Sequence, residues 1–303
     1  SGLLAAALIA VWPSFMMHSI HLLRDTLAIL LILAVIWIFI ITLNRELTWR
    51  SSLTITLQGW LFLALFWLTR GNMWNLILLA LPLTALLLLI RLLLDRKIRY
   101  LNVAVLGALI VAALVVPPKM QNTGLGPARF VSPLVTVGST SQQQNFWERL
   151  GRQVKSRRAG FRIYSTNGSD MDTEVQFNST GDVVRFLPRA IAIGFLAPFP
   201  NMWFQEGTNG RAARLVTGAE TLVMYALYIL ALLCLWRHHR NLSMWLVFLI
   251  AALGMIALGV IVVNAGALYR LRYVFWILII VLAAEGFLLW KTNKPQIDAD
   301  YTD

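Results

Sequence analysis

Two short polar stretches, each beside a long apolar run, contain the residue types that could do chemistry. In the first stretch, His18, His21, Arg24 and Asp25 precede an apolar run that begins at Thr26. A carboxylate can accept a proton from a hydroxyl group or help to bind a divalent metal, and neighbouring cations can hold an anion. The structural alternative is that Asp25 caps the helix starting at Thr26, because a negative charge is stabilised at a helix N-terminus.

The second stretch covers residues 264–273 (NAGALYRLRY) and precedes the last apolar run. Tyr269, Arg270 and Arg272 are the candidates for binding a phosphate, because the planar guanidinium group donates two hydrogen bonds to phosphate oxygens. The two arginines are two positions apart, so they diverge on a helix and point the same way in an extended segment. The alternative is a belt of aromatic and basic residues at the membrane interface.

A third stretch, residues 186–203 (FLPRAIAIGFLAPFPNMW), is apolar but contains Arg189 and several prolines. We expect a rigid ledge at the membrane face, with a role as a lid over lipid as the alternative. Two acids, Glu220 and Glu285, lie inside apolar runs, where acids can mark functional sites. Glu220 lies near the outer end of its run and could join an outer site, whereas Glu285 is expected to pair with a cation near Lys291.

The elements that must position these residues are membrane spans. Hydrophobic residues make up 58% of the chain and charged residues 13%, compared with about 25% charged in a soluble domain. A helix needs about 20 apolar residues to cross a bilayer, and the sequence therefore predicts an all-α polytopic membrane bundle. The candidate spans are residues 3–12 (incomplete), 26–43, 51–69, 75–94, 101–116, 215–236, 241–263 and 273–290. Because the first is only half a span, we expect upstream sequence to precede Ser1.

The domain organisation follows from these spans. We expect N-terminal membrane helices in residues 1–116, an extramembrane insert in 117–182, and an interfacial or re-entrant helix with a ledge in 183–214. C-terminal membrane helices follow in 215–290, and a tail in 291–303. The turns at 44–50, 95–100 and 237–240 and the tail are rich in Lys and Arg. Basic loops stay on the cytoplasmic side, which predicts a periplasmic insert and a location in the bacterial inner membrane.

The net charge of +12 indicates anionic lipid or phosphate as the partner, and nucleic acid is not expected as a partner. The single cysteine, Cys234, lies in an apolar run, which excludes a disulfide framework and a Cys/His zinc pattern. The sequence has no Walker loop, no HExxH zinc motif and no dinucleotide-binding glycine pattern.

A half-span, then Pro13, then Asp25 at the start of the next span resembles the second outer loop of GT-C membrane glycosyltransferases. These enzymes use polyprenyl-phosphate sugars, and the resemblance covers residues 1–70 and the overall span pattern. It implies that Asp25 supports a first-loop aspartate near the acceptor and any metal. That first-loop residue has no counterpart here and would lie upstream of Ser1. The tyrosines and arginines of residues 264–273 are also similar to GT-C-like proteins of bacterial surface-polysaccharide pathways.

The resemblance implies transfer of a sugar from a polyprenyl-phosphate carrier to a glycan or lipid acceptor, at the outer face of the membrane. Asp25 is the catalytic candidate, and a divalent metal at Asp25 stays an open alternative. The candidates for binding the lipid phosphate or the acceptor are His21, Arg24, Arg189, Tyr269, Arg270 and Arg272. Three alternatives remain: a polysaccharide polymerase or ligase, a transporter or flippase of the same pathway, and a noncatalytic membrane partner. A transporter should show polar residues at mid-membrane and broken helices in matching halves, which this sequence largely lacks.

Overall fold

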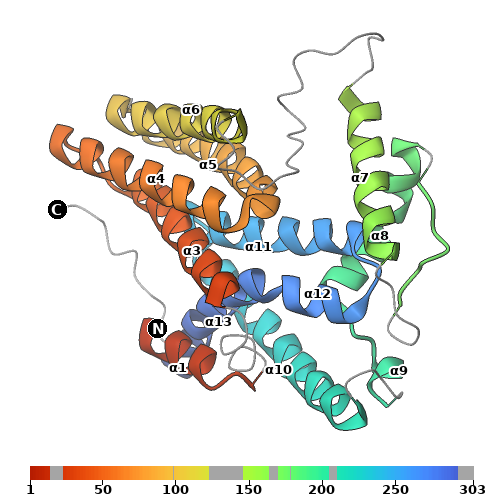
Figure 1. The fold of residues 1–303 in the computed structure, drawn as a ribbon. Helices are drawn as coiled ribbons and strands as arrows, with labels where there is room; N and C mark the ends of the chain where they lie inside the picture. The colour runs from red at the N-terminus through yellow and green to blue at the C-terminus, as the bar shows by residue number, and fades with distance from the viewer. Residues whose placement is uncertain are drawn as a thin grey trace.

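The computed structural model describes residues 1–13, 23–97, 99–122, 146–163, 170–177, 179–204 and 210–292. The helices are α1 (Gly2–Ala10), α3 (Leu23–Asn44), α4 (Trp49–Arg70), η1 (Gly71–Met73), α5 (Trp74–Asp95), α6 (Tyr100–Asn122), α7 (Phe146–Ile163), α8 (Thr180–Leu196), α9 (Pro200–Trp203), α10 (Gly210–Arg237), α11 (Leu242–Ile261), α12 (Ala265–Leu271) and α13 (Tyr273–Thr292). These described segments contain no β-strand, only an isolated bridge between Asp170 and Asn264. The chain is all-α (Figure 1), as predicted.

Among the described residues, six helices are long and apolar enough to cross a membrane. They are Thr26–Asn44, Trp49–Arg70, Trp74–Asp95, Arg214–Arg237, Leu242–Ile261 and Tyr273–Thr292. They confirm six of the predicted spans and a multi-pass membrane protein. The predicted span at 101–116 lies in α6, whose apolar part, Tyr100–Val115, is shorter. The incomplete span at 3–12 forms α1, a helix of nine residues.

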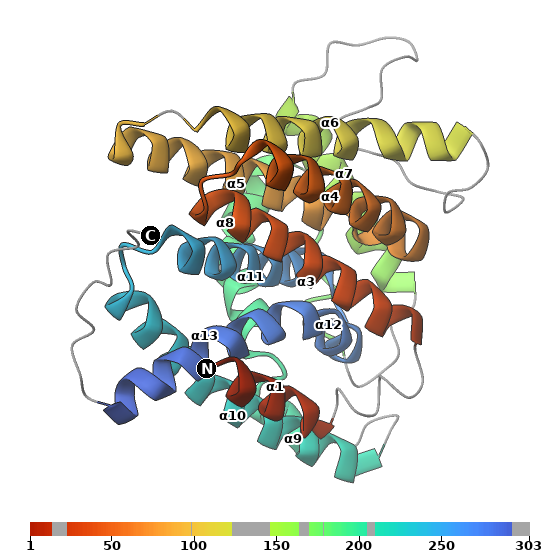
Figure 2. The same cartoon turned by 90° about the vertical axis from the view of Figure 1, so that its left-hand side faces the viewer.

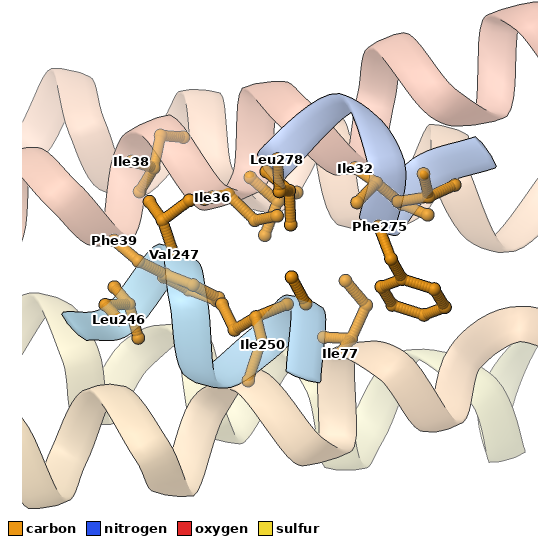
Figure 3. Close-up of a cluster of buried hydrophobic side chains, with 14 of the residues drawn as sticks. Ile32, Ile36, Ile38, Phe39, Ile77, Leu246, Val247, Ile250, Phe275 and Leu278 are labelled. Carbon is orange, nitrogen blue, oxygen red and sulfur yellow. The ribbon is translucent and has the colours of Figure 1, made fainter. Parts of the chain in front are cut away.

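Helix α11 is the centre of the bundle and packs against α3, α5, α13 and α8. Figure 2 shows α11 running beside α3 and α5. In Figure 3, Leu246 and Ile250 of α11 belong to one cluster with Phe39 of α3, Ile77 of α5 and Leu278 of α13. These side chains are all 3% exposed or less. A helix that contacts partners on several sides must be apolar around its whole circumference, which explains why residues 241–263 carry no charge.

Three basic turns meet at one end of the bundle. Arg91 near the end of α5 donates from Nη1 to Asn44 Oδ1 at 3.1 Å, and Ser243 at the start of α11 donates to the same oxygen at 2.7 Å. Lys97, after α5, pairs with Glu46, after α3, at 2.9 Å. The turns after α3, α5 and α10 therefore lie together, as expected if they all face one side of the membrane.

The described part of the predicted insert lies at the opposite end. Arg158 of α7 donates from Nη1 to the carbonyl of Val260, in the last turn of α11, at 2.7 Å. Figure 1 shows α7 and α8 standing across this end of α11. The fold thus separates the three basic turns from α7, which is the separation that the sequence predicted.

Helix α8 covers the segment for which the sequence predicts an interfacial or re-entrant helix. It starts with a capping box between Ser179 and Asp182 and packs closely on α11. A Cβ atom at Gly259 would collide with the Ala190 carbonyl, and one at Gly194 would collide with the Met255 carbonyl. Met255 lies six residues before the end of α11, which corresponds to a depth of about 9 Å at 1.5 Å per residue. The C-terminal end of α8 therefore reaches below the end of a membrane-spanning helix.

The contact between α8 and α11 should tolerate no side chain at Gly259. We expect Gly259→Ala to destabilise the protein by about 1–3 kcal/mol, the usual cost of overpacking, because the new methyl group meets a backbone carbonyl. Gly107 in α6 is the matched control, since a Cβ there would meet nothing within 4 Å. Gly107→Ala should stabilise its helix by about 0.5–1 kcal/mol. Thermal unfolding in detergent measures both, and a Gly259→Ala protein that melts no lower than wild type would contradict the packing.

The positions of the basic turns also predict the topology. In a Cys234→Ser background, a cysteine replacing the exposed Lys155 of α7 should react with an impermeant thiol reagent in intact cells. A cysteine replacing Lys97, whose side chain is 64% exposed, should react only after the cells are opened. The reverse labelling pattern would overturn the orientation, and reaction of both after lysis is the control for accessibility.

Candidate anion-binding site at Arg272

The chain between α11 and α13 places the predicted arginines on helical turns. Asn264 caps α12 by accepting a hydrogen bond from the Ala267 N–H at 3.1 Å. The amide of Arg272 donates to the Leu268 carbonyl at 3.0 Å, and the Arg272 carbonyl accepts from the Trp276 amide at 2.9 Å. Because the backbone is helical here, the two arginines diverge. Arg270 is exposed, whereas Arg272 is 0% exposed, so they do not form one clamp.

The buried Arg272 side chain is only partly satisfied. Its Nη1 donates to the carbonyl of Gly194 at 3.0 Å. The guanidinium lies over the ring of Trp276 at 4.7 Å from the centroid and over Tyr269 at 5.7 Å. Its Nε and Nη2 atoms have no hydrogen-bond partner among the residues that the structure describes. Arginine is always charged, so this edge of the guanidinium favours an anion.

The Gly194 carbonyl belongs to the end of α8, where the last carbonyls of a helix lack partners within the helix. Side chains from α10 and from the turn between α12 and α13 supply those partners. In order from Gly194 to Leu196, the donors to the last three carbonyls are Arg272 Nη1 at 3.0 Å, the Tyr228 hydroxyl at 3.2 Å and the Tyr225 hydroxyl at 2.6 Å. A cation is also favourable at the negative end of the helix dipole. This structural role of Arg272 uses one of its three guanidinium nitrogens.

Arg158 provides the comparison within the same protein. It is 3% exposed, and all three of its guanidinium nitrogens donate to backbone carbonyls. The acceptors are Val260 at 2.7 Å, Asp172 at 2.7 Å and Val175 at 3.3 Å. Burial lowers the pKa of Arg158. An arginine whose role is to hold segments together is thus fully bonded here, and Arg272 is not.

Arg189, a predicted substrate-binding residue, pairs with a carboxylate of the chain itself. Its Nε contacts Asp172 Oδ2 at 2.7 Å and its Nη2 contacts Asp172 Oδ1 at 3.2 Å. The hydrogen bonds that Arg189 donates to Asp172 raise the pKa of Arg189, and the guanidinium lies over Phe199 at 4.9 Å. Arg189 therefore joins α8 to the residues before it. This contact fits the expectation that residues 186–203 form a rigid ledge.

The two intramembrane acids lie at opposite ends of the bundle. Glu220 of α10 is 6% exposed and accepts a hydrogen bond from the hydroxyl of Tyr269. Tyr269 was itself a candidate from the sequence, and its ring contacts Arg272. Glu285 of α13 lies 3.7 Å from Nε2 of His238, in the turn after α10. The described neighbour of Glu285 is therefore a histidine of a basic turn, where the sequence predicts a cation near Lys291.

The structure brings together the second and third stretches that the sequence singled out, together with the end of the incomplete span. Trp12, the last residue of that span, packs edge-on against Trp276 at 6.2 Å. Arg272, from the second, contacts both Trp276 and Gly194, which belongs to the third. The convergence places Arg272 at the meeting point of α1, α8, α10 and α13.

The remaining candidates lie in part outside the described residues. This applies to His21 entirely, and to the side chains of Arg24 and Asp25, whose backbone forms the first turn of α3. Figure 3 places Ile32 of α3 beside Phe275 of α13. Helices α3 and α13 therefore both begin at the end of the bundle where Arg272 lies. Within the described part of the chain, no group of three His, Cys, Asp or Glu residues could hold a metal ion.

Sequence reasoning missed Tyr225 and Tyr228, which bond the end of α8. Their spacing of three places both hydroxyls on one face of α10, and this was the available signal. Comparison with known proteins adds no further assignment, because no protein-family model, curated protein or solved structure matches the chain.

Proposed function

We propose that this chain is a membrane glycosyltransferase that moves a sugar from a polyprenyl-phosphate carrier to a glycan or lipid acceptor. The reaction would take place at the end of the bundle where α8 and α12 lie. One observation supports this proposal most directly: the buried guanidinium of Arg272 has two nitrogens without a partner among the described residues. A phosphate at the membrane boundary is the anion that a lipid-linked donor brings to such a place.

The two guanidinium nitrogens of Arg272 that lack a partner among the described residues are suitably placed to bind an oxyanion. Nε and Nη2 form one edge of the guanidinium, and this edge donates two parallel hydrogen bonds to a carboxylate or phosphate. Arg189 uses the same two atoms to hold both oxygens of Asp172. Arg272 thus presents the edge that Arg189 has filled, next to the rings of Trp276 and Tyr269.

This arrangement suits the breaking of a bond to phosphate. As the bond from the sugar to the phosphate breaks, negative charge grows on the phosphate oxygen, and donors already in place stabilise it. The backbone of Asp25 lies in the first turn of α3, at the same end of the bundle. Its carboxylate would orient the acceptor hydroxyl or bind a divalent metal.

The proposal also includes the periplasmic side of the membrane and the assembly of surface polysaccharides. The grouping of the three basic turns at the other end supports a cytoplasmic position for those turns. The site would then face the periplasm of a bacterial inner membrane, where surface polysaccharides are assembled. A polymerase or ligase would use the same phosphate contact, and a flippase would bind the carrier without releasing the sugar.

The phosphate contact predicts a specific loss of binding. Purified protein in detergent should bind farnesyl phosphate and not farnesol, which lacks the charge. Arg272→Lys keeps a cation but loses the two-pronged geometry. It should weaken binding of farnesyl phosphate at least about tenfold, which corresponds to about 1.4 kcal/mol. Isothermal titration calorimetry gives the dissociation constants.

Arg158→Lys is the control for this experiment. It breaks a buried network of hydrogen bonds to three carbonyls and should lower the melting temperature, yet leave the affinity for farnesyl phosphate unchanged. If wild type and Arg272→Lys bind farnesyl phosphate with equal affinity, Arg272 does not contact the phosphate. Equal affinity of wild type for farnesol and farnesyl phosphate would show that only the hydrocarbon is bound.

Asp25→Asn separates capping from catalysis. Asparagine caps a helix about as well as aspartate, but it cannot accept a proton or hold a metal firmly. We expect normal expression and melting with loss of sugar transfer from polyprenyl-phosphate donors. Transfer close to the wild-type rate would leave Asp25 as a cap alone.

A further inference from the structure

Tyr269, whose ring contacts Arg272, donates a hydrogen bond to the buried Glu220, and the phosphate contact gives this hydrogen bond no role. We propose that Glu220 is the group that accepts the proton of the acceptor hydroxyl during sugar transfer, and that Tyr269 positions it. This inference rests on the proposed function and adds a further catalytic residue to it.

The geometry links Glu220 to Arg272 through a single side chain. The hydroxyl of Tyr269 donates to Oε2 of Glu220, and the ring of the same tyrosine lies 5.7 Å from the Arg272 guanidinium carbon. Tyr269 also packs edge-on against Trp276 at 4.8 Å, which fixes the plane of its ring. A carboxylate and a guanidinium on either side of one rigid ring can act on the same reaction. The carboxylate would act on the acceptor hydroxyl and the guanidinium on the leaving phosphate.

The position of Glu220 in α10 also fits an acid–base group. Its span begins at Arg214, so Glu220 is six residues, or about 9 Å, inside that span. Burying a carboxylate is costly, and the hydrogen bond that the Tyr269 phenol donates to Glu220 offsets part of that cost. An ionisable side chain at this depth in a membrane span is a candidate functional group.

The proposed step is a substitution at the anomeric carbon of the sugar. The acceptor hydroxyl oxygen forms a bond to the anomeric carbon of the sugar, and its proton moves to a carboxylate oxygen of Glu220. The bond from the anomeric carbon to the phosphate oxygen breaks, and its electron pair stays on that oxygen. Arg272 stabilises the charge through Nε and Nη2. The products are the glycosylated acceptor, the polyprenyl phosphate and a protonated Glu220, and Asp25 is left to orient the acceptor or bind a metal.

Glu220→Gln tests the role with little change in structure, because the amide oxygen can still accept the hydrogen bond from Tyr269. The assay follows release of farnesyl phosphate from hexosyl- and pentosyl-phosphofarnesol, in membrane vesicles that contain the native acceptors. We expect kcat to fall at least about 100-fold, the usual contribution of a general base, while KM and the affinity for farnesyl phosphate stay within about twofold. Glu220→Asp should recover part of the rate.

Two further variants serve as comparisons. Glu285→Gln removes the other intramembrane acid and should leave kcat unchanged. Tyr269→Phe removes the hydrogen bond to Glu220 but keeps the ring beside Arg272. It should lower kcat about tenfold with no change in farnesyl phosphate binding, as expected for a positioning residue that acts on the general base.

Each outcome decides between the two proposals. Turnover by Glu220→Gln at the wild-type rate overturns the role of Glu220 and leaves the transferase proposal intact. A parallel loss of farnesyl phosphate binding and of melting temperature in Glu220→Gln shows a structural role and also overturns the inference. A wild-type protein that binds farnesyl phosphate but releases none from either donor overturns the transferase proposal together with the inference.

Discussion

A helix that ends within a membrane bundle must have its last carbonyls bonded by protein, because lipid offers no hydrogen-bond donors. The end of α8 meets this condition through Arg272, Tyr228 and Tyr225. The positions of α10 and of the turn between α12 and α13 are tied to it, since each brings donors to one small region. The buried cation at this end of the bundle is thus a consequence of where α8 ends.

The same constraint explains how a structural residue can also be a binding residue. The helix end requires one donor from Arg272, and a guanidinium has three nitrogens in a plane. Gly194 takes Nη1, and the opposite edge is left with Nε and Nη2. Arg158, by contrast, spends all three nitrogens on backbone carbonyls. An anion on Arg272 would complete the guanidinium without displacing it from α8.

Much of the fold could be predicted from the sequence, because span length and basic turns are local signals. Residues 26–43 and 241–263 must be membrane helices whatever surrounds them. The divergence of Arg270 and Arg272 could not be predicted, since it depends on whether residues 265–272 are helical or extended. The partner of Glu285 was also out of reach, because His238 meets it only when α10 and α13 pack together. The long-range bonds of Tyr225 and Tyr228 were hidden for the same reason.

The close packing of α8 on α11 links the fold to the proposed chemistry. Gly194 of α8 and Gly259 of α11 bring the backbones of the two helices into direct contact, so neither helix can move closer to the other. The Gly194 carbonyl is therefore held in place. Arg272 is anchored to that carbonyl and stacked on Trp276, so its free edge is fixed before any ligand arrives. Donors that need no rearrangement stabilise developing charge most effectively. The two glycines therefore act on the site through the orientation of Arg272, although neither glycine has a side chain that could contact a ligand.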